Sequence, residues 1–315
     1  MLKKNILFLS FILFLNLHSQ DLNKLIESHQ NQGSIEVVSD FQSSFVEDRI
    51  VEFWLPPNFD PTNKYDLLIM HDGQNLFDAN KTWNKQEWKL DEWASKLISE
   101  NELSSFIIIG IHNSGKNRWN DYFPQKAYDF VIDAKYLNDK KPALYADLYL
   151  KYIVDELIPF TKSKYLKSSD DFRIVIGGSS MGGLISMYAA FEYPEIFDGA
   201  ICMSTHWPGA FVIDNNPLPD AIFKYMFQNI PKSKGKTFYF DYGDQGLDKH
   251  YPQYSKRVDS IFINNGYSEN NFKNLYFKNT SHSEDSWSKR VHIPLKFTLN
   301  EDLDGNLELL GRKNL

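Results

Sequence analysis

The segment FRIVIGGSSMGGLI occupies Phe172–Ile185 and contains a strand signal, a glycine-rich turn and a helix signal in succession. Ile174–Ile176 are β-branched apolar residues that favour a buried strand, and Leu184–Glu192 has a helical pattern. Between them, Gly178-Ser179-Ser180-Met181-Gly182 matches G-x-S-x-G, a motif that needs this strand–turn–helix context. Residues without side chains fit beside the strained serine of such a turn. The pattern predicts Ser180 as a nucleophile exposed at the start of a helix.

Two other glycine-rich turns join a strand to a helix, and neither fits this segment. A dinucleotide-binding turn needs glycines at positions i, i+2 and i+5. Starting from Gly177 or Gly178, position i+2 is Ser179 or Ser180. The phosphate-binding loop requires Gly-Lys-Ser/Thr, which does not follow here.

Strand-like and helix-like segments alternate along the chain, which predicts an α/β fold with a mostly parallel central sheet and helices on both faces. In such folds, ligands bind beyond the carboxyl ends of the strands. The expected strands are Ser34–Val38, Ile50–Leu55, Asp66–Met70, Phe106–Ile111, Ile174–Ile176, Gly199–Met203, Phe238–Tyr242 and Leu275–Phe277. The expected helices are Lys85–Glu100, Ala143–Tyr165, Leu184–Glu192, Asp220–Gln228 and Tyr254–Asn265.

His282 is the candidate base because it lies in a polar loop after the last expected strand and follows the serine in the chain. In an α/β-hydrolase fold the order is serine, acid, histidine. The loop after Phe238–Tyr242 offers two acids, Asp244 and Asp248. We favour Asp248, which lies deeper in the loop beside a helix start, and expect Asp244 to form the turn. In this arrangement, His282 would take the proton of Ser180 while the acid fixes the imidazole.

An oxyanion needs two converging N–H donors, and two segments can supply them. The N–H of Met181 opens the helix that follows Ser180. Asp66–Met70 runs directly into His71-Asp72-Gly73-Gln74, where the glycine lets the backbone turn, so Gln74 is the second candidate donor. We expect His71 and Asp72 to fix this loop rather than to react, because they precede the serine.

The first residues, MLKKNILFLSFILFLNLHSQ, have two lysines followed by an apolar run, as in a secretory signal peptide. We expect cleavage after Ser19, so that residues 1–19 are the signal and residues 20–315 form a single domain. The apolar run is short for a membrane span, which predicts no stable membrane association after cleavage. The formal net charge of −7 disfavours a nucleic-acid partner. The single cysteine, Cys202, excludes an intramolecular disulfide and is expected in a buried strand.

Taken together, these motifs resemble the putative-esterase family of α/β-hydrolases, which includes enterochelin, feruloyl and acetylxylan esterases, S-formylglutathione hydrolase and the mycolyltransferases. The resemblance covers nearly all the chain after the expected signal. Asp121 stands where the family usually has glutamate. The segments that carry the resemblance are Arg49–Pro57, Leu67–Phe77, Asn113 with Arg118 and Asp121–Pro124, Gly178–Gly183, and His282–Trp287.

The resemblance implies a secreted or periplasmic serine ester hydrolase that acts through an acyl-enzyme without metal or cofactor. Carbohydrate-linked feruloyl or acetyl esters and siderophore esters are the expected substrates. His206 and Trp207 follow a strand end and, with Arg118, are the predicted substrate-binding residues. An acyltransferase with the same triad and a non-catalytic ligand-binding member of the fold are the alternatives.

Overall fold

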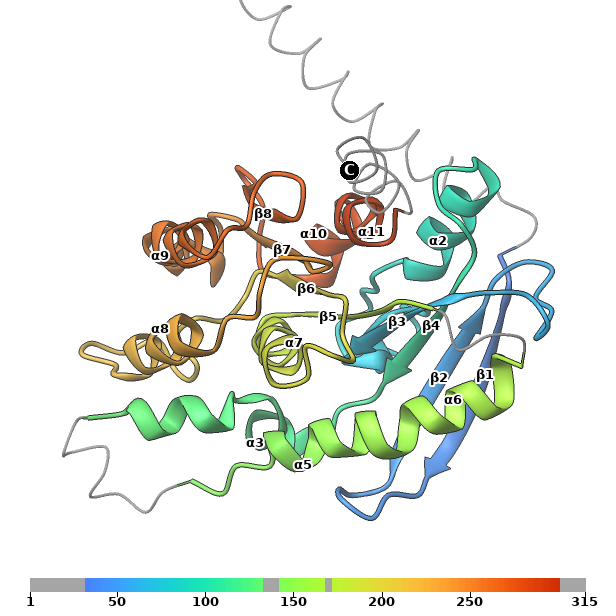
Figure 1. Cartoon of the computed structure of the whole chain (residues 1–315), viewed down its shortest axis with the longest axis horizontal. Helices are drawn as coiled ribbons and strands as arrows, with labels where there is room; N and C mark the ends of the chain where they lie inside the picture. Colours follow the sequence, from blue (N-terminus) through green and yellow to red (C-terminus); the bar gives the residue numbers. More distant parts are fainter. Residues whose placement is uncertain (1–31, 133–141, 168–171, 301–315) are drawn as a thin grey trace, which may run out of the picture.

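The computed structural model describes residues 32–132, 142–167 and 172–300, which form one eight-stranded sheet covered by helices (Figure 1). The strand order is β1-β2-β4-β3-β5-β6-β7-β8. β1 pairs antiparallel with β2, and β2 antiparallel with β4, whereas all pairs from β4 to β8 are parallel. The strands are β1 Ser34–Phe41, β2 Arg49–Leu55, β3 Asp66–His71, β4 Phe106–Ile111, β5 Ile174–Ser179, β6 Gly199–Met203, β7 Thr237–Tyr242 and β8 Phe272–Tyr276.

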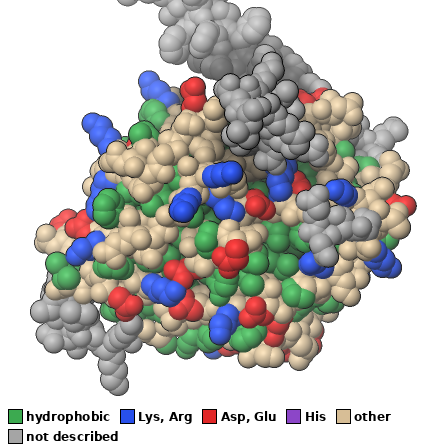
Figure 2. Space-filling view, in the orientation of Figure 1, with side chains coloured by type: hydrophobic (Ala, Val, Ile, Leu, Met, Phe, Trp, Pro, Cys, Tyr) green, Lys and Arg blue, Asp and Glu red, His purple; other side chains and the backbone are tan. Residues whose placement is uncertain are grey.

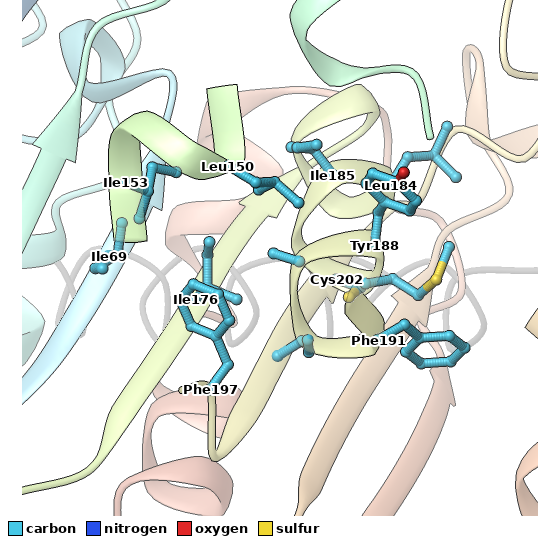
Figure 3. Packing of buried hydrophobic residues seen from close by; sticks show 14 of the residues in the cluster. Ile69, Leu150, Ile153, Ile176, Leu184, Ile185, Tyr188, Phe191, Phe197 and Cys202 are labelled. Carbon is cyan, nitrogen blue, oxygen red and sulfur yellow. The ribbon is translucent and has the colours of Figure 1, made fainter. Parts of the chain in front are cut away.

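The central strands β3 to β6 are mostly apolar and are buried along almost their whole length, because helices cover both faces of the sheet. One apolar cluster contains side chains from α3, α5, α6, α7, α8 and α9, and the other contains side chains from α2, α10 and α11. Figure 3 shows members of the first cluster, among them Leu184, Ile185 and Tyr188 of α7 and Ile176 of β5. The helices are α2 Leu90–Ser99, α3 Arg118–Tyr122, α5 Ala146–Lys151, α6 Ile158–Tyr165, α7 Met181–Glu192, α8 Leu218–Asn229, α9 Pro252–Asn264, α10 Glu284–Ser288 and α11 His292–Thr298.

The predicted α/β architecture is confirmed, but two expected helices differ from those observed. The helix expected from Lys85 begins at Leu90, because Lys85 and Lys89 have left-handed backbone conformations that a helix cannot include. The helix expected over Ala143–Tyr165 contains a π-helical segment at Tyr152–Leu157. Pro159 follows that segment and has no N–H to donate within the helix, so the regular ladder is interrupted there.

The expected signal peptide and the polar end of the chain from Glu301 lie outside the described residues. Among the residues that are described, no helix has the length and apolarity to cross a membrane. Acidic and basic side chains are interspersed over the face shown in Figure 2.

Candidate active site

Ser180 lies at the sharp turn between β5 and α7, with φ 59° and ψ −122°. A positive φ is strained for a serine, and the surrounding backbone holds it in place. The Ser180 N–H donates to the Met203 carbonyl at 2.9 Å, and the Ser180 carbonyl accepts from the His206 N–H at 3.1 Å. The turn therefore presents the half-buried Ser180 side chain at the carboxyl end of β5, as the G-x-S-x-G pattern predicts.

His282 lies against Asp248, with 2.6 Å between Nδ1 of the histidine and Oδ1 of the acid. Asp248 is fully buried, and its Oδ2 accepts from the Ser204 hydroxyl at 2.6 Å and from the Gly243 N–H at 2.7 Å. Burial alone would raise the pKa of Asp248, but hydrogen bonds from His282, Ser204 and Gly243 bring that pKa below its ordinary value. The ionised carboxylate holds the proton of His282 on Nδ1, which leaves Nε2 as the basic nitrogen.

A buried polar network behind Asp248 fixes its carboxylate. The Ser204 hydroxyl that donates to Asp248 accepts from Trp287 Nε1 at 2.9 Å and from Arg290 Nη2 at 3.0 Å. Arg290 also forms a two-pronged ion pair with Asp241, with distances of 2.9 and 3.0 Å. The sequence analysis did not identify Ser204 or Arg290, because their partners are distant in the chain.

Asp244, the alternative acid, lies on the surface and serves the turn that leads to the histidine loop. Its carboxylate accepts from the Tyr276 hydroxyl at 2.6 Å, from the Asn279 N–H at 2.8 Å and from Gln245 Nε2 at 2.9 Å. These bonds hold the pKa of Asp244 below its ordinary value. Of the two acids, the structure brings Asp248 to His282.

The two expected oxyanion donors lie on adjoining segments. Gln74 is in the short 3₁₀ turn Gly73–Asn75 that follows β3, and its N–H has no acceptor within that turn. A Cβ added at Gly73 would lie 2.4 Å from the Gly110 carbonyl carbon, so a side chain there would displace the turn. Met181 begins α7, and a Cβ added at the next residue, Gly182, would lie 3.4 Å from both Asp72 Oδ2 and His71 Cβ. The close packing holds the two backbone segments together at one edge of the sheet.

Arg118, a predicted substrate-binding residue, forms an ion pair with Asp72 in the loop after β3 that carries Gln74. Its Nε and Nη2 donate to the two Asp72 carboxylate oxygens at 2.6 and 2.7 Å. Asn113 also donates to Asp72, at 2.7 Å. Burial would raise the pKa of Asp72, but the Arg118 charge and these hydrogen bonds bring it below its ordinary value. Arg118 therefore fixes the loop that carries Gln74, while about 30% of its side chain stays exposed.

The two predicted pocket residues after β6 are both largely buried. Trp207 is 5% exposed and stacks on Phe223 and Phe240, with ring centroids 4.9 and 5.8 Å apart. The structure thus gives Trp207 a core position, which favours helix-to-sheet packing over the expected substrate contact. His206 is 8% exposed and bonds to Tyr251 and to the Ala210 carbonyl, at 2.7 and 2.6 Å.

Tyr251 is a site residue that the sequence analysis missed. It is 1% exposed, its hydroxyl lies near the Ser180 side chain, and its ring contacts the His282 ring edge-on with centroids 5.8 Å apart. Asp248 begins a single 3₁₀ turn, and the Tyr251 N–H donates to the Asp248 carbonyl at 2.9 Å. The sequence signal that could have identified it is the three-residue spacing from Asp248 to Tyr251, since one 3₁₀ turn places residues i and i+3 on the same side.

Cys202 is buried in β6, as expected, and burial raises the pKa of its thiol well above the ordinary value. A reactive thiolate at this position is therefore disfavoured. Among the described residues, no group of three or more histidine, cysteine, aspartate or glutamate side chains is arranged to hold a metal ion.

Proteins with related sequences have been identified in bacteria. The chain is 25% identical over 175 residues to the uncharacterized protein YjcH of Bacillus subtilis (strain 168), a match to 55% of this chain and 62% of that protein. It is 23% identical over 185 residues to an endo-1,4-beta-xylanase/feruloyl esterase of Xylanibacter ruminicola, a match to 56% of this chain but 23% of that protein. The chain thus matches less than two thirds of the length of either relative.

Solved esterase structures share the fold. A ferulic acid esterase superposes with a TM-score of 0.61 at 17% identity, covering 84% of this chain and 98% of that one. The enterobactin esterase of Shigella flexneri gives a TM-score of 0.59 at 16% identity, covering 89% of this chain and 61% of that one. The feruloyl esterase module of Clostridium thermocellum gives 0.60 at 15% identity, covering 88% and 92%. At these identities, the likeness establishes the α/β-hydrolase-type fold.

The family assignment follows from the sequence itself. The family model described as "Putative esterase" matches residues 43–293, a range that includes the Ser180 turn, the Asp248 turn and the His282 loop. Family and fold together support a carboxylic ester hydrolase. The chain belongs to the putative esterase family of α/β-hydrolases.

Proposed function

We propose that the protein is a serine carboxylic ester hydrolase in which Ser180, His282 and Asp248 act as a catalytic triad. The observation that carries the proposal is the 2.6 Å contact between His282 and the buried Asp248, beside a serine held at φ 59°. This geometry provides a half-buried hydroxyl on a strained turn and an imidazole whose Nε2 can accept a proton. Those are the two requirements for activating a serine.

In the proposed reaction, His282 Nε2 removes the proton from Ser180 as Oγ attacks the ester carbonyl carbon. The N–H groups of Gln74 and Met181 stabilise the oxyanion of the tetrahedral intermediate. His282 then gives its proton to the leaving alcohol, and the acyl group remains on Ser180. Water attacks this acyl-enzyme with His282 again as base, and the acid product leaves.

We propose esters of aromatic or acetyl acids with carbohydrate or siderophore alcohols as the substrate class. The support is the similarity to ferulic acid, feruloyl and enterobactin esterases. The proposed location is the periplasm or the extracellular space, supported by the sequence pattern of residues 1–19. Mass analysis of the exported protein should find Gln20 at its N-terminus.

A panel of purified enzyme against p-nitrophenyl acetate, methyl ferulate, acetylated xylan and a siderophore trilactone tests the proposal. Wild-type protein should release acid from at least one ester, and Ser180→Ala should release none above background. Ser179→Ala is the matched control, since it removes the neighbouring hydroxyl and should keep activity. Hydrolysis by Ser180→Ala at the wild-type rate would overturn the proposal.

A further inference from the structure

The hydrogen bonds of His206 determine which way the neighbouring Tyr251 hydroxyl points. His206 Nε2 lies 2.6 Å from the Ala210 carbonyl, which can only accept, so Nε2 carries the ring proton. Burial lowers the pKa of His206 to about 4, so the ring is neutral near pH 7 and Nδ1 has a lone pair. Tyr251 lies 2.7 Å from Nδ1 and must therefore donate its proton to it.

Because Tyr251 donates its only hydroxyl proton to His206, its oxygen can act only as an acceptor toward Ser180. The tyrosine is buried, and burial raises its pKa, so it keeps its proton. The Ser180 side chain lies near the Tyr251 hydroxyl, and because the tyrosine proton is already given to His206, only the serine hydroxyl can donate between the two. The Ser180 carbonyl also accepts from the His206 backbone, which ties the three residues together. Tyr251 is thus an acceptor available to the Ser180 hydroxyl besides His282, the proposed base.

We propose that Tyr251, oriented by His206, is a positioning residue for the water that hydrolyses the acyl-enzyme. This inference rests on the proposed serine ester hydrolase function. Once Ser180 is acylated, it has no proton to donate, and the Tyr251 oxygen becomes free for another O–H. The edge-on contact between the Tyr251 and His282 rings sets this acceptor beside the base that activates the water.

In the proposed step, one water proton moves to His282 Nε2 as the water oxygen bonds to the acyl carbon. The second proton stays on that oxygen and hydrogen-bonds to Tyr251. The tetrahedral intermediate collapses with cleavage of the bond between the acyl carbon and Ser180 Oγ, and His282 returns its proton to Oγ. The acid product leaves with the oxygen of the water.

An alcohol that attacks the same acyl-enzyme gives its single hydroxyl proton to His282 and has none for Tyr251. The tyrosine acceptor therefore favours water over alcohol, which makes it a determinant of hydrolysis against acyl transfer. Removing one hydrogen bond of this kind should slow hydrolysis of the acyl-enzyme by about 2- to 13-fold. Attack by an alcohol should be spared.

The test compares wild type with Tyr251→Phe on p-nitrophenyl acetate at increasing methanol concentrations. The variant should keep kcat/KM for p-nitrophenol release within about threefold, because this ratio reports acylation. Its kcat and KM should fall together as deacylation becomes limiting. The ratio of methyl acetate to acetate in the products should rise by the factor by which hydrolysis slows, about 2- to 13-fold.

Tyr267→Phe is the matched control, because that buried tyrosine donates to the Pro231 carbonyl at 3.2 Å, away from the site. It should leave the product ratio unchanged. His206→Leu, which frees the Tyr251 proton, should raise the ratio in the same direction as Tyr251→Phe. An unchanged product ratio in Tyr251→Phe, or equal losses in kcat and kcat/KM, would overturn the inference. A Ser180→Ala variant with full activity would instead remove the proposed function on which it rests.

Discussion

Asp248→Asn is the substitution whose effect can be worked out most fully from the structure. The asparagine side chain has one acceptor oxygen, whereas the aspartate uses two. In the native site, Oδ2 faces the Ser204 hydroxyl and the Gly243 N–H, while Oδ1 faces His282. The asparagine oxygen will take the Oδ2 position, because two donors are satisfied there and one is satisfied at Oδ1. Its NH₂ group then faces His282 Nδ1 and forces the ring proton onto Nε2.

The expected loss combines two effects. If the amide oxygen instead faces His282, the NH₂ group faces the buried Gly243 N–H, and two opposed donors cost about 2–3 kcal/mol. The population of the productive tautomer, with the proton on Nδ1, therefore falls about 30- to 150-fold. The neutral amide also gives up the attraction between carboxylate and imidazolium. That attraction is on the order of 2–4 kcal/mol for a partly buried pair. Together these effects predict a fall in kcat of about 10³–10⁵-fold, in the range known for triad acids.

The assay is steady-state hydrolysis of p-nitrophenyl acetate near pH 7.5, with melting temperatures to confirm that each variant is folded. Asp244→Asn provides the same chemical change on the same loop, at a residue that bonds to Tyr276 and Asn279. It should lose less than about tenfold in kcat. A larger loss in Asp244→Asn than in Asp248→Asn would refute the reasoning. Near-normal activity in both variants would indicate a serine–histidine pair without an acid.

Three further predictions concern the surrounding structure. Arg290→Met leaves the buried Asp241 carboxylate uncompensated and should lower the free energy of unfolding by about 3–5 kcal/mol in urea titrations. Trp207→Phe should lower the free energy of unfolding by about 1–3 kcal/mol and keep KM within about threefold. A tenfold rise in KM would instead indicate that Trp207 contacts the substrate. Burial lowers the pKa of His206 to about 4 and that of His71 to about 3, so the folded protein resists protonation that the unfolded chain accepts from pH 6.5 downward. The free energy of unfolding should therefore be highest above pH 6.5 and fall by roughly 1.4 kcal/mol per pH unit for each histidine between pH 6.5 and 4; an unchanged value over that range contradicts the prediction.

The sequence was sufficient for the fold because its signals are local. Apolar strands such as Phe106–Ile111 are continuous, and the glycine pattern around Ser180 is contiguous with a strand and a helix. Helix boundaries were less predictable where single residues decide them. Lys89 adopts a left-handed conformation that its residue type does not favour, so the polar residues before it looked helical.

The site was predictable where residue order along the chain limits the choices, as for His282. The side-chain partners were not, because they depend on distant contacts. Ser204 and Asp248 are 44 positions apart in the sequence, and Arg290 and Ser204 are 86 positions apart. Trp207 follows a strand end, where core packing and substrate contact favour the same residue type. Tyr251 lies between the loop that carries Asp248 and the helix expected from Tyr254, and its position depends on the 3₁₀ turn that begins at Asp248.

The central claim is that Ser180 forms a covalent acyl-enzyme, and covalent labelling tests it most directly. Intact-mass analysis after treatment with a fluorophosphonate should show one added phosphonyl group, and peptide mapping should assign it to Ser180. Ser179→Ala should label as wild type, and Ser180→Ala should neither label nor hydrolyse esters, with a loss of about 10⁴-fold or more. Labelling that persists in Ser180→Ala, or that disappears in Ser179→Ala alone, would contradict the account.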